Sequence, residues 1–214
     1  MNLDAIGGIT AFHNAVRKDL GEIDAAVYAV ASNHGGELSP VLERFKPFSL
    51  VLGHHAHGED VAVFPALERV APHVAEAYEI DHRELDVMVH DLEAVLGAQD
   101  ELAAARAMTT LATHLRVHLA KEDAHMYPLL RAATTADEQL KILDGLVAVI
   151  PGEDFPPLLT WFYGLAPAEE RALVTELWLA MVGEDGLPWF RGMAKECIAA
   201  EGWADLTRRC PALA

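Results

Sequence analysis

Two short stretches of the chain repeat one pattern of metal-binding side chains. The pattern His-x3-Glu-Asp-x3-aromatic-Pro occurs at residues 55–65 and again at residues 118–128. Residues four apart on a helix lie on one face, so His55 and Glu59 can reach one centre, and so can His118 and Glu122. The repeat therefore supplies four nitrogen and carboxylate donors from two equivalent helices.

Two further histidines complete the set. His13 and His82 each interrupt an otherwise apolar helical stripe, on helices that we expect to run opposite to those of the repeat, and can come to the same level. A buried carboxylate is costly unless it is paired or binds a cation, and two facing glutamates also repel each other. The pattern therefore predicts a metal centre with six ligands: His13, His55, Glu59, His82, His118 and Glu122.

The ligand set indicates how many metals the centre holds. Six ligands exceed what one tetrahedral zinc needs, but they suit two metals that are each bound by two imidazoles and bridged by two carboxylates. Nitrogen and oxygen donors without a thiolate suit iron, cobalt, nickel, zinc or copper, and iron is the default for such a pair. A metal-free helical interaction protein is the alternative, but it would have to bury four imidazoles and two carboxylates in one layer.

Four long helices are expected to position these residues. They span residues 4–31, 37–70, 73–98 and 101–132, and Gly- or Pro-containing breaks separate them. Each carries an apolar seam with alternating steps of three and four residues. Short connections favour antiparallel neighbours, so the sequence predicts an all-α, up-down-up-down four-helix bundle. We expect the seams of the second and fourth helices to continue through Ala62 and Ala66 and through His125 and Leu129.

The character of the chain changes after about residue 133. All four tryptophans lie in this part, together with prolines at positions 151, 156, 157, 167 and 188. We therefore divide the chain into a bundle, residues 1–133, and a helical extension that packs on it, residues 134–214. Helices are expected near 135–149, 156–164, 167–182 and 187–200. The aromatic residues after position 150 are interpreted as packing anchors, and an exposed share of them is a candidate homodimer contact.

Composition excludes several classes of function. The formal charge of −17 repels nucleic acids and anionic membranes. The sequence shows neither a basic stretch followed by an apolar run at its start nor eighteen successive apolar residues, so we expect a soluble, cytoplasmic protein. Cys197 and Cys210 form no CxxC arrangement, which suggests neither a disulfide framework nor a thiolate metal site.

The histidine-rich segments resemble those of the hemerythrin-like, or HHE cation-binding, family of the bacterial type. The matching segments are AFHNAV, HHAHGEDVAVFPAL, DHRELD and HLRVHLAKEDAHMYPLL, and they fall on all four expected bundle helices. The resemblance implies a non-haem centre of two irons with an oxo or hydroxo bridge, in which Glu59 and Glu122 also bridge. It implies that one iron binds the first two histidines of the set and the other binds the last two. It further implies reactivity with dioxygen, peroxide or nitric oxide.

One departure from the family pattern bears on function. The invertebrate oxygen carriers of this family have a His-x3-His pair on the third helix, whereas this chain has Tyr78 and His82. We hypothesise that Tyr78 hydrogen-bonds to the bridging glutamates or binds iron. The departure argues against simple reversible oxygen storage and favours peroxide or nitric oxide chemistry.

Several polar residues near the seams have weaker interpretations. Asp60 and Asp123 follow the glutamates and either orient a neighbouring imidazole or lie in solvent. His114 and His125 are candidates to line the site or its access path, with binding of the metal, above all by His114, and a surface position as the alternatives.

The leading hypothesis is therefore a diiron protein that binds or reacts with small oxidants. No nucleophile constellation or nucleotide-binding glycine motif is present, and no catalytic residue is assigned. The sequence leaves open whether the protein is an enzyme. If it is one, we expect a diiron oxidoreductase acting on peroxide or nitric oxide. The alternative is an iron- or oxygen-sensing regulatory module in which metal occupancy controls the C-terminal region.

Overall fold

The computed structural model describes residues 3–33 and 36–214, and all regular elements within these ranges are helical. The all-α prediction is thus confirmed for this part of the chain. His34, which the sequence places in a break between helices, lies outside the described residues. None of the helices described is long and apolar enough to cross a membrane.

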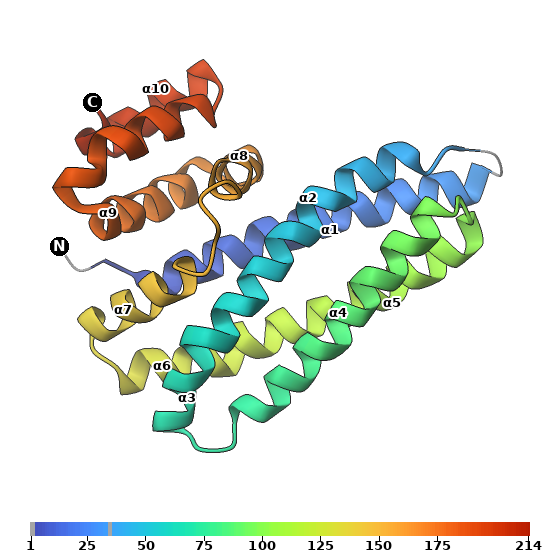
Figure 1. The fold of residues 1–214 in the computed structure, drawn as a ribbon, viewed down its shortest axis with the longest axis horizontal. Helices are drawn as coiled ribbons and strands as arrows, with labels where there is room; N and C mark the ends of the chain where they lie inside the picture. The colour runs from blue at the N-terminus through green and yellow to red at the C-terminus, as the bar shows by residue number, and fades with distance from the viewer. Residues whose placement is uncertain (1–2, 34–35) are drawn as a thin grey trace.

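Four long helical rods lie side by side in Figure 1. The first is α1 (Ala5–Asn33) and the third is α4 (Ala75–Gly97). The second consists of α2 (Ser39–Gly58), the π-helix η1 (Glu59–Val63) and α3 (Phe64–Val70). The fourth consists of α5 (Glu101–Lys121), the π-helix η2 (Glu122–Met126) and α6 (Tyr127–Ala133). Helices α1 and α4 each contact both α2 and α5.

Local sequence explains where these rods begin. A proline lies in the first turn of α2, where its missing N–H leaves no hydrogen bond unmade. The Asp100 side chain caps α5 by accepting a hydrogen bond from the backbone N–H of Ala103. The predicted boundaries of the four long helices agree with the observed ones to within a few residues.

The two π-helices were not predicted, and they begin at the two glutamates of the repeat. The backbone N–H of Phe64 donates to the carbonyl of Glu59, and that of Tyr127 donates to the carbonyl of Glu122, five residues back in each case. The residue after each of these aromatics is a proline, which has no N–H for a regular helical hydrogen bond. The second and fourth rods therefore each contain one widened turn, at the level of Glu59 and of Glu122.

The widened turns shift the buried face of the helix that follows. Beyond Glu122 the buried residues are Met126, Tyr127 and Leu130, whereas His125 and Leu129 are exposed. The predicted seam was therefore wrong at His125 and Leu129. The wider turn holds one more residue than an α-helical turn, so the helix beyond it is rotated relative to an uninterrupted 3.6-residue period. In the second rod Val63, Phe64 and Leu67 are buried, Ala66 is buried as expected, and Ala62 is only partly buried.

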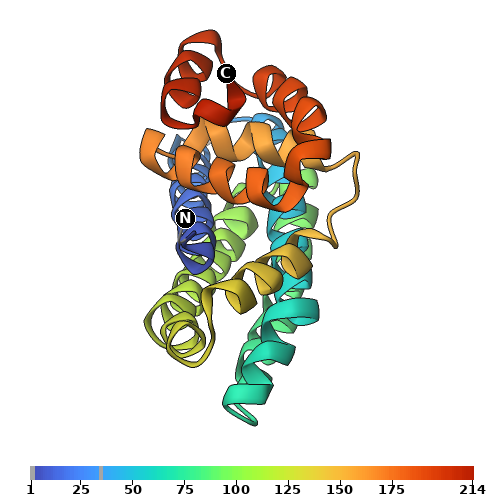
Figure 2. The same ribbon diagram turned by 90° about the vertical axis from the view of Figure 1, so that its left-hand side faces the viewer.

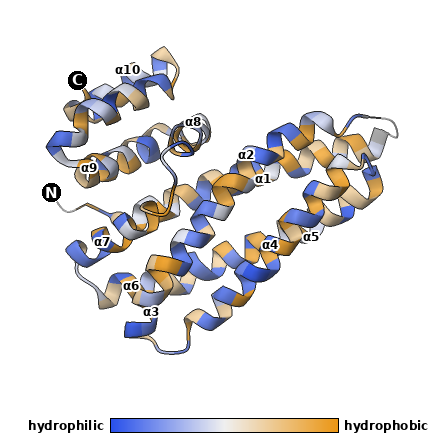
Figure 3. Cartoon of the chain, viewed as in Figure 1, coloured by the Kyte–Doolittle hydropathy of each residue, from blue (hydrophilic) through white to orange (hydrophobic). Residues whose placement is uncertain are grey.

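Two clusters of apolar side chains lie on either side of the histidine level. On α1, Ile9 belongs to one cluster and Val16 to the other, with His13 between them. On α4, Tyr78 belongs to the first cluster and Leu85 to the second, with His82 between them. Figure 3 shows hydrophobic and hydrophilic positions alternating along these rods. The predicted ligands therefore occupy a polar layer between two apolar clusters.

The C-terminal helices pack beside the first half of the chain, as Figure 2 shows. They are α7 (Ala136–Val147), α8 (Phe155–Leu165), α9 (Ala168–Glu196), α10 (Ala200–Arg209) and a 3-10 turn (Pro211–Leu213). Helix α1 contacts α7, α8 and α9, and α2 contacts α7 and α8. Two separate helices were predicted where α9 runs, and α9 is kinked there at Gly183, whose φ is 65°. Helix α10 lies beyond the last predicted helix.

Candidate metal centre

The six predicted ligands are all buried and come together in two overlapping groups. In each group one donor atom per residue can be chosen so that these atoms all lie within 4.8 Å of one another. Both groups contain Glu59 and Glu122. The first group adds His13 and His55, and the second adds His82 and His118. The two carboxylates therefore stand between two pairs of imidazoles.

The imidazole Nε2 atoms face the carboxylates. His55 Nε2 lies 3.4 Å from Glu59 Oε1, and His82 Nε2 lies 3.3 Å from Glu59 Oε2. Glu122 has similar neighbours, with His118 Nε2 at 3.0 Å from its Oε1 and His13 Nε2 at 3.6 Å from its Oε2. The Nε2 atoms of His13 and His55 are 2.9 Å apart. Donor atoms of both kinds thus converge on a small volume.

Three of the four imidazoles are held from behind by aspartates. His13 Nδ1 lies 2.9 Å from Asp123 Oδ1, and His82 Nδ1 lies 2.8 Å from Asp60 Oδ1. These two aspartates follow the glutamates of the repeat, and each orients the imidazole of another helix. His118 Nδ1 lies 3.0 Å from Asp81 Oδ2. An Nδ1–H that donates to a carboxylate leaves the Nε2 lone pair directed into the centre, as metal-binding histidines require.

His55 has a different environment. Its ring packs against Phe12, with ring centroids 4.8 Å apart, and no described residue forms a hydrogen bond with its Nδ1. Phe12 precedes His13, just as Asp81 precedes His82. Equivalent positions on α1 and α4 therefore place an aromatic ring behind His55 and a carboxylate behind His118.

A tyrosine holds one of the two glutamates, but it is not the tyrosine that the sequence suggested. The hydroxyl of Tyr127, which is buried, donates a hydrogen bond to Glu59 Oε1. The Tyr78 hydroxyl donates instead to the backbone carbonyl of Lys121, at 3.5 Å. Among the described residues no hydrogen bond joins Tyr78 to Glu59 or Glu122. Binding of a metal by Tyr78 remains a hypothesis.

The pKa values of the two carboxyls shift in opposite directions. Burial raises the pKa of Glu122, and the neighbouring charge of Glu59 raises it further. Burial also raises the pKa of Glu59, but the nearby His55 and His82 outweigh it and the net pKa is lowered. Without a cation, therefore, the two carboxylates compete for positive charge.

The imidazoles show the same competition. Burial lowers the pKa of His82, but its hydrogen bond with Asp60 and the nearby Glu59 carboxylate outweigh burial and raise the pKa to about 10. At His55 burial outweighs the opposing charge of Glu59 and lowers the pKa to about 3.

Several buried polar atoms of the centre have no hydrogen-bond partner among the described residues. They are Glu59 Oε2, His82 Nε2 and both carboxylate oxygens of Glu122. A buried polar atom without a partner costs stability, and unpaired buried carboxylates are especially unfavourable. All of these atoms lie on the inner side of the layer, where a bound cation would complete their interactions. The donor set therefore fits divalent metal ions.

The other histidines that the structure describes lie outside the two groups. His114 is partly exposed, and its Nε2 is 3.8 Å from Asp81 and 3.6 Å from Glu84. His54 Nε2 is hydrogen-bonded to Asp154 Oδ2, at a distance of 2.8 Å. His57, His90 and His125 are exposed.

Two residues of the centre were missed at the sequence level. Asp81 lies directly before a predicted ligand, and Tyr127 is the aromatic residue of the second repeat, where the first repeat has Phe64. The difference between Phe64 and Tyr127 was the available signal for the hydrogen bond to Glu59. The bond itself depends on the rotation that η2 introduces, which the sequence pattern did not reveal.

Comparison with known proteins supports the metal-binding interpretation. The family model described as the hemerythrin HHE cation binding domain matches residues 4–139. The zinc finger protein BRUTUS of Arabidopsis thaliana is 28% identical over 167 residues, which cover 74% of this chain and 13% of that protein. A BRUTUS-like zinc finger protein of the same plant is 26% identical over 220 residues, covering 92% of this chain and 18% of its own length. The chain thus spans less than a fifth of these relatives. No solved structure matches it significantly.

Proposed function

The chain belongs to the hemerythrin HHE cation-binding domain family, and from that premise we propose that it is a diiron protein that binds or reacts with dioxygen, nitric oxide or hydrogen peroxide. The observation that carries the proposal is the layer of buried, unpartnered donor atoms shared between two groups of side chains. Two irons would satisfy both groups at once, with Glu59 and Glu122 as the shared ligands. The remaining ligands would be His13 and His55 for one iron and His82 and His118 for the other.

Each residue of the centre has a defined part in this proposal. Iron supplies electrons and open coordination positions for a small molecule. Asp123, Asp60 and Asp81 hold the Nδ1 protons of their imidazoles and so fix the direction of the Nε2 lone pairs. Tyr127 fixes Glu59, and the buried position of all six ligands keeps bulk water from the layer. No side chain is assigned as a catalytic acid or base.

We further propose that residues 1–133 form an up-down-up-down four-helix bundle and that residues 134–214 form a helical extension packed on it. The support for the bundle is the contact of α1 and α4 with both α2 and α5, together with the short connections between consecutive rods. The order of the two apolar clusters also alternates. Along α1 the cluster of Ile9 precedes that of Val16, whereas along the second rod the cluster of Leu52 precedes that of Val63.

Anaerobic loading with ferrous iron tests the proposed function. We expect about two irons per chain, and an absorption in air that dithionite bleaches. Separate additions of dioxygen, nitric oxide and hydrogen peroxide distinguish the two outcomes: with reversible binding the original spectrum returns when the gas is removed, and disproportionation of peroxide releases oxygen together with water. His55→Ala should lose iron, whereas His90→Ala, a matched change at an exposed position, should retain it. Iron content well below one per chain under iron-rich expression would contradict the proposal.

A regulatory module remains a second candidate because the C-terminal helices contact the centre directly. Helix α7 packs on the π-helix η1, which contains Glu59. Its backbone approaches so closely that a Cβ added at Gly58 would lie 2.5 Å from the carbonyl oxygen of Leu146. Phe12 also contacts both His55 and Trp161, with ring centroids 4.8 and 5.3 Å apart. Metal binding could therefore change how firmly residues 134–214 pack.

Limited proteolysis with and without iron tests the second candidate. If occupancy controls the C-terminal region, iron should slow cleavage after residue 133 more than cleavage within the four rods. Equal protection of both parts would leave only the first candidate.

We also propose a cytoplasmic location and a homodimer contact through the C-terminal aromatic residues. Trp178, Phe162 and Phe190 are buried, as packing anchors should be, but Trp189 is 57% exposed. Trp189→Ser should therefore lower the dimer fraction in sedimentation experiments. An unchanged dimer, or a monomeric parent chain, would remove this contact.

A further inference from the structure

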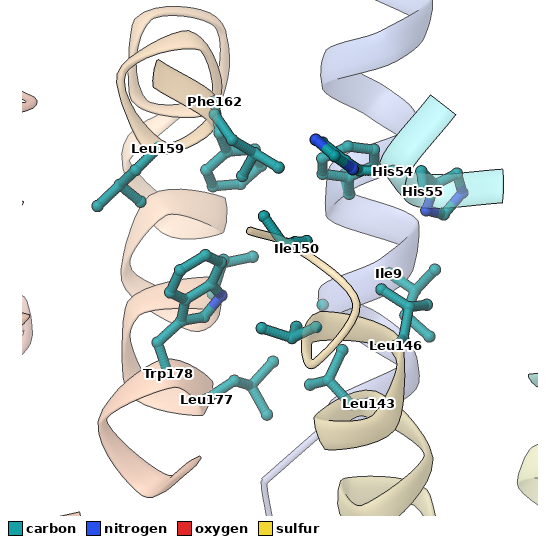
Figure 4. A pocket seen from close by; sticks show the side chains of 15 residues that line it. Ile9, His54, His55, Leu143, Leu146, Ile150, Leu159, Phe162, Leu177 and Trp178 are labelled. Carbon is teal, nitrogen blue, oxygen red and sulfur yellow. The ribbon is translucent and has the colours of Figure 1, made fainter. Parts of the chain in front are cut away.

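An apolar pocket lies between the first half of the chain and the C-terminal helices. Side chains from α1, α2, α7, α8 and α9 line it, and most of them fall after residue 139, beyond the part that matches the family model. Figure 4 shows Leu143, Leu146, Leu177 and Trp178 gathered around its interior. The pocket is therefore a feature of how this chain packs its own C-terminal helices.

The lining leaves almost nothing for a polar ligand to bind. Only His54, His55 and Trp178 contribute polar side chains, and His54 Nε2 is already bonded to Asp154. The cavity volume is about 60 Å³. An apolar cavity of about 150 Å³ in another protein stays free of water and holds benzene or xenon. This pocket is smaller and equally apolar in character, so it offers water few hydrogen-bond partners and has room for a molecule of only a few heavy atoms.

The pocket reaches the candidate metal centre at His55. This imidazole lines the apolar pocket and also a second cavity, of about 70 Å³, which His82 and His118 border. The second cavity differs in that Ser49 and Asp86 contribute polar groups to it. Phe12, which packs on the His55 ring, belongs to the wall of the apolar pocket. His55 and Phe12 thus separate the apolar pocket from the interior of the centre.

We propose that this pocket holds a small, uncharged gas molecule and delivers it to the centre past His55. The inference rests on the proposed function, and it deepens it by naming a gas, dioxygen or nitric oxide, as the ligand that enters from this side. Both gases are weakly hydrated and gain by moving from water into an apolar space. Hydrogen peroxide does not suit the pocket, because its two hydroxyls would lose their hydrogen bonds there.

Xenon binding tests the pocket without reference to the metal. Crystals of the full chain, once free of metal and once loaded with iron, are exposed to xenon gas. We expect xenon between Leu146, Leu159 and Leu177 in both forms. Val174→Phe adds a ring to the pocket wall and should abolish this site, whereas Val87→Phe makes the same change at a position 58% exposed and should leave it intact. Absence of xenon from the pocket of the parent chain would overturn the proposal.

A second variant keeps the test decisive if Val174→Phe does not fold. Leu159→Ala enlarges the same pocket and should raise xenon occupancy. Unchanged occupancy in Leu159→Ala would show that the xenon lies elsewhere, and this outcome also overturns the proposal.

The rate of nitric oxide binding to the iron-loaded protein tests delivery. Val174→Phe should slow it several-fold, and Val87→Phe should not. An unchanged rate in a Val174→Phe protein that has lost its xenon site would refute the delivery route. If the parent chain binds xenon but its iron never reacts with either gas, the proposed function fails while the pocket stands, so the two failures are distinguishable.

Discussion

Removal of one hydroxyl group, in Tyr127→Phe, should measurably destabilise the metal-free protein. Glu59 is fully buried, and Tyr127 is its hydrogen-bond donor from the opposite rod. Burial and the charge of Glu59 raise the pKa of Tyr127 well above its ordinary value, so the phenol remains a donor throughout the neutral and alkaline range. Phenylalanine should fit the site, because Phe64 occupies the equivalent position of the first repeat.

The size of the effect follows from the charge and burial of the acceptor. A hydrogen bond to a charged group contributes about 1.5–3 kcal/mol, and its loss here leaves a carboxylate oxygen in a site closed to water. We therefore expect the free energy of unfolding to fall by about 1.5–3 kcal/mol, which is a large share of the roughly 5–15 kcal/mol of a typical domain.

Urea unfolding in the presence of a chelator measures this difference. The slope of the free energy against urea should not change, because both variants bury the same surface. Tyr28→Phe is the matched control, since Tyr28 is 60% exposed and its hydroxyl should contribute less than about 0.5 kcal/mol. If Tyr127→Phe and Tyr28→Phe had the same stability, the reasoning that this hydroxyl secures Glu59 would be refuted.

Three further predictions concern the support of the centre and the packing around it. Asp123→Asn should weaken metal binding by about 10- to 100-fold in a competition titration, whereas Asp91→Asn, at an exposed position, should not change it. Gly58→Ala should lower the free energy of unfolding by about 1–3 kcal/mol, because the added Cβ meets a carbonyl oxygen of α7. At Gly53 an added Cβ has no atom within 4 Å, so Gly53→Ala should stabilise α2 slightly. Equal effects of the two changes in urea unfolding would contradict the close approach of α7 to Gly58. Burial raises the pKa of the Cys210 thiol from 9.0 to about 11. The folded chain therefore keeps this proton more firmly than the unfolded chain does, and the stability that results is fully present below pH 9 and is lost as the pH rises toward 11. The stability difference between the chain and Cys210→Ala should shrink by about 1–3 kcal/mol over that range, and a constant difference would contradict the shift.

The sequence was most informative where the helices are regular. On α1 the residues Ile6, Ile9, His13, Val16 and Leu20 follow one helical stripe and are all buried, because nothing interrupts the 3.6-residue period. The same reasoning located the six candidate ligands, since charged and imidazole groups stand out in an apolar stripe. Their role as ligands to two irons stays a prediction.

Sequence reasoning failed where the backbone departs from the α-helix. The π-helices exposed His125 and Leu129 and brought Tyr127 to the inside, and no periodicity argument counts the extra residue that a widened turn contains. The prolines after Phe64 and Tyr127 were a visible warning, but they do not by themselves distinguish a kink from a π-helix. Tyr78 was singled out from a family pattern, whereas its observed partner is a backbone carbonyl, which no side-chain pattern encodes.

The environments behind the histidines make the two halves of the centre unequal. An approximate two-fold exchange relates His55 and Glu59 to His118 and Glu122, and His13 to His82. The exchange fails at Phe12, whose equivalent is Asp81, and at Phe64, whose equivalent is Tyr127. Behind His13 and His55 lie one aspartate, the Phe12 ring and the apolar pocket, whereas two aspartates lie behind His82 and His118. Two cations in these halves would bind with different affinities, so a calorimetric titration with a divalent metal should resolve two successive steps rather than one.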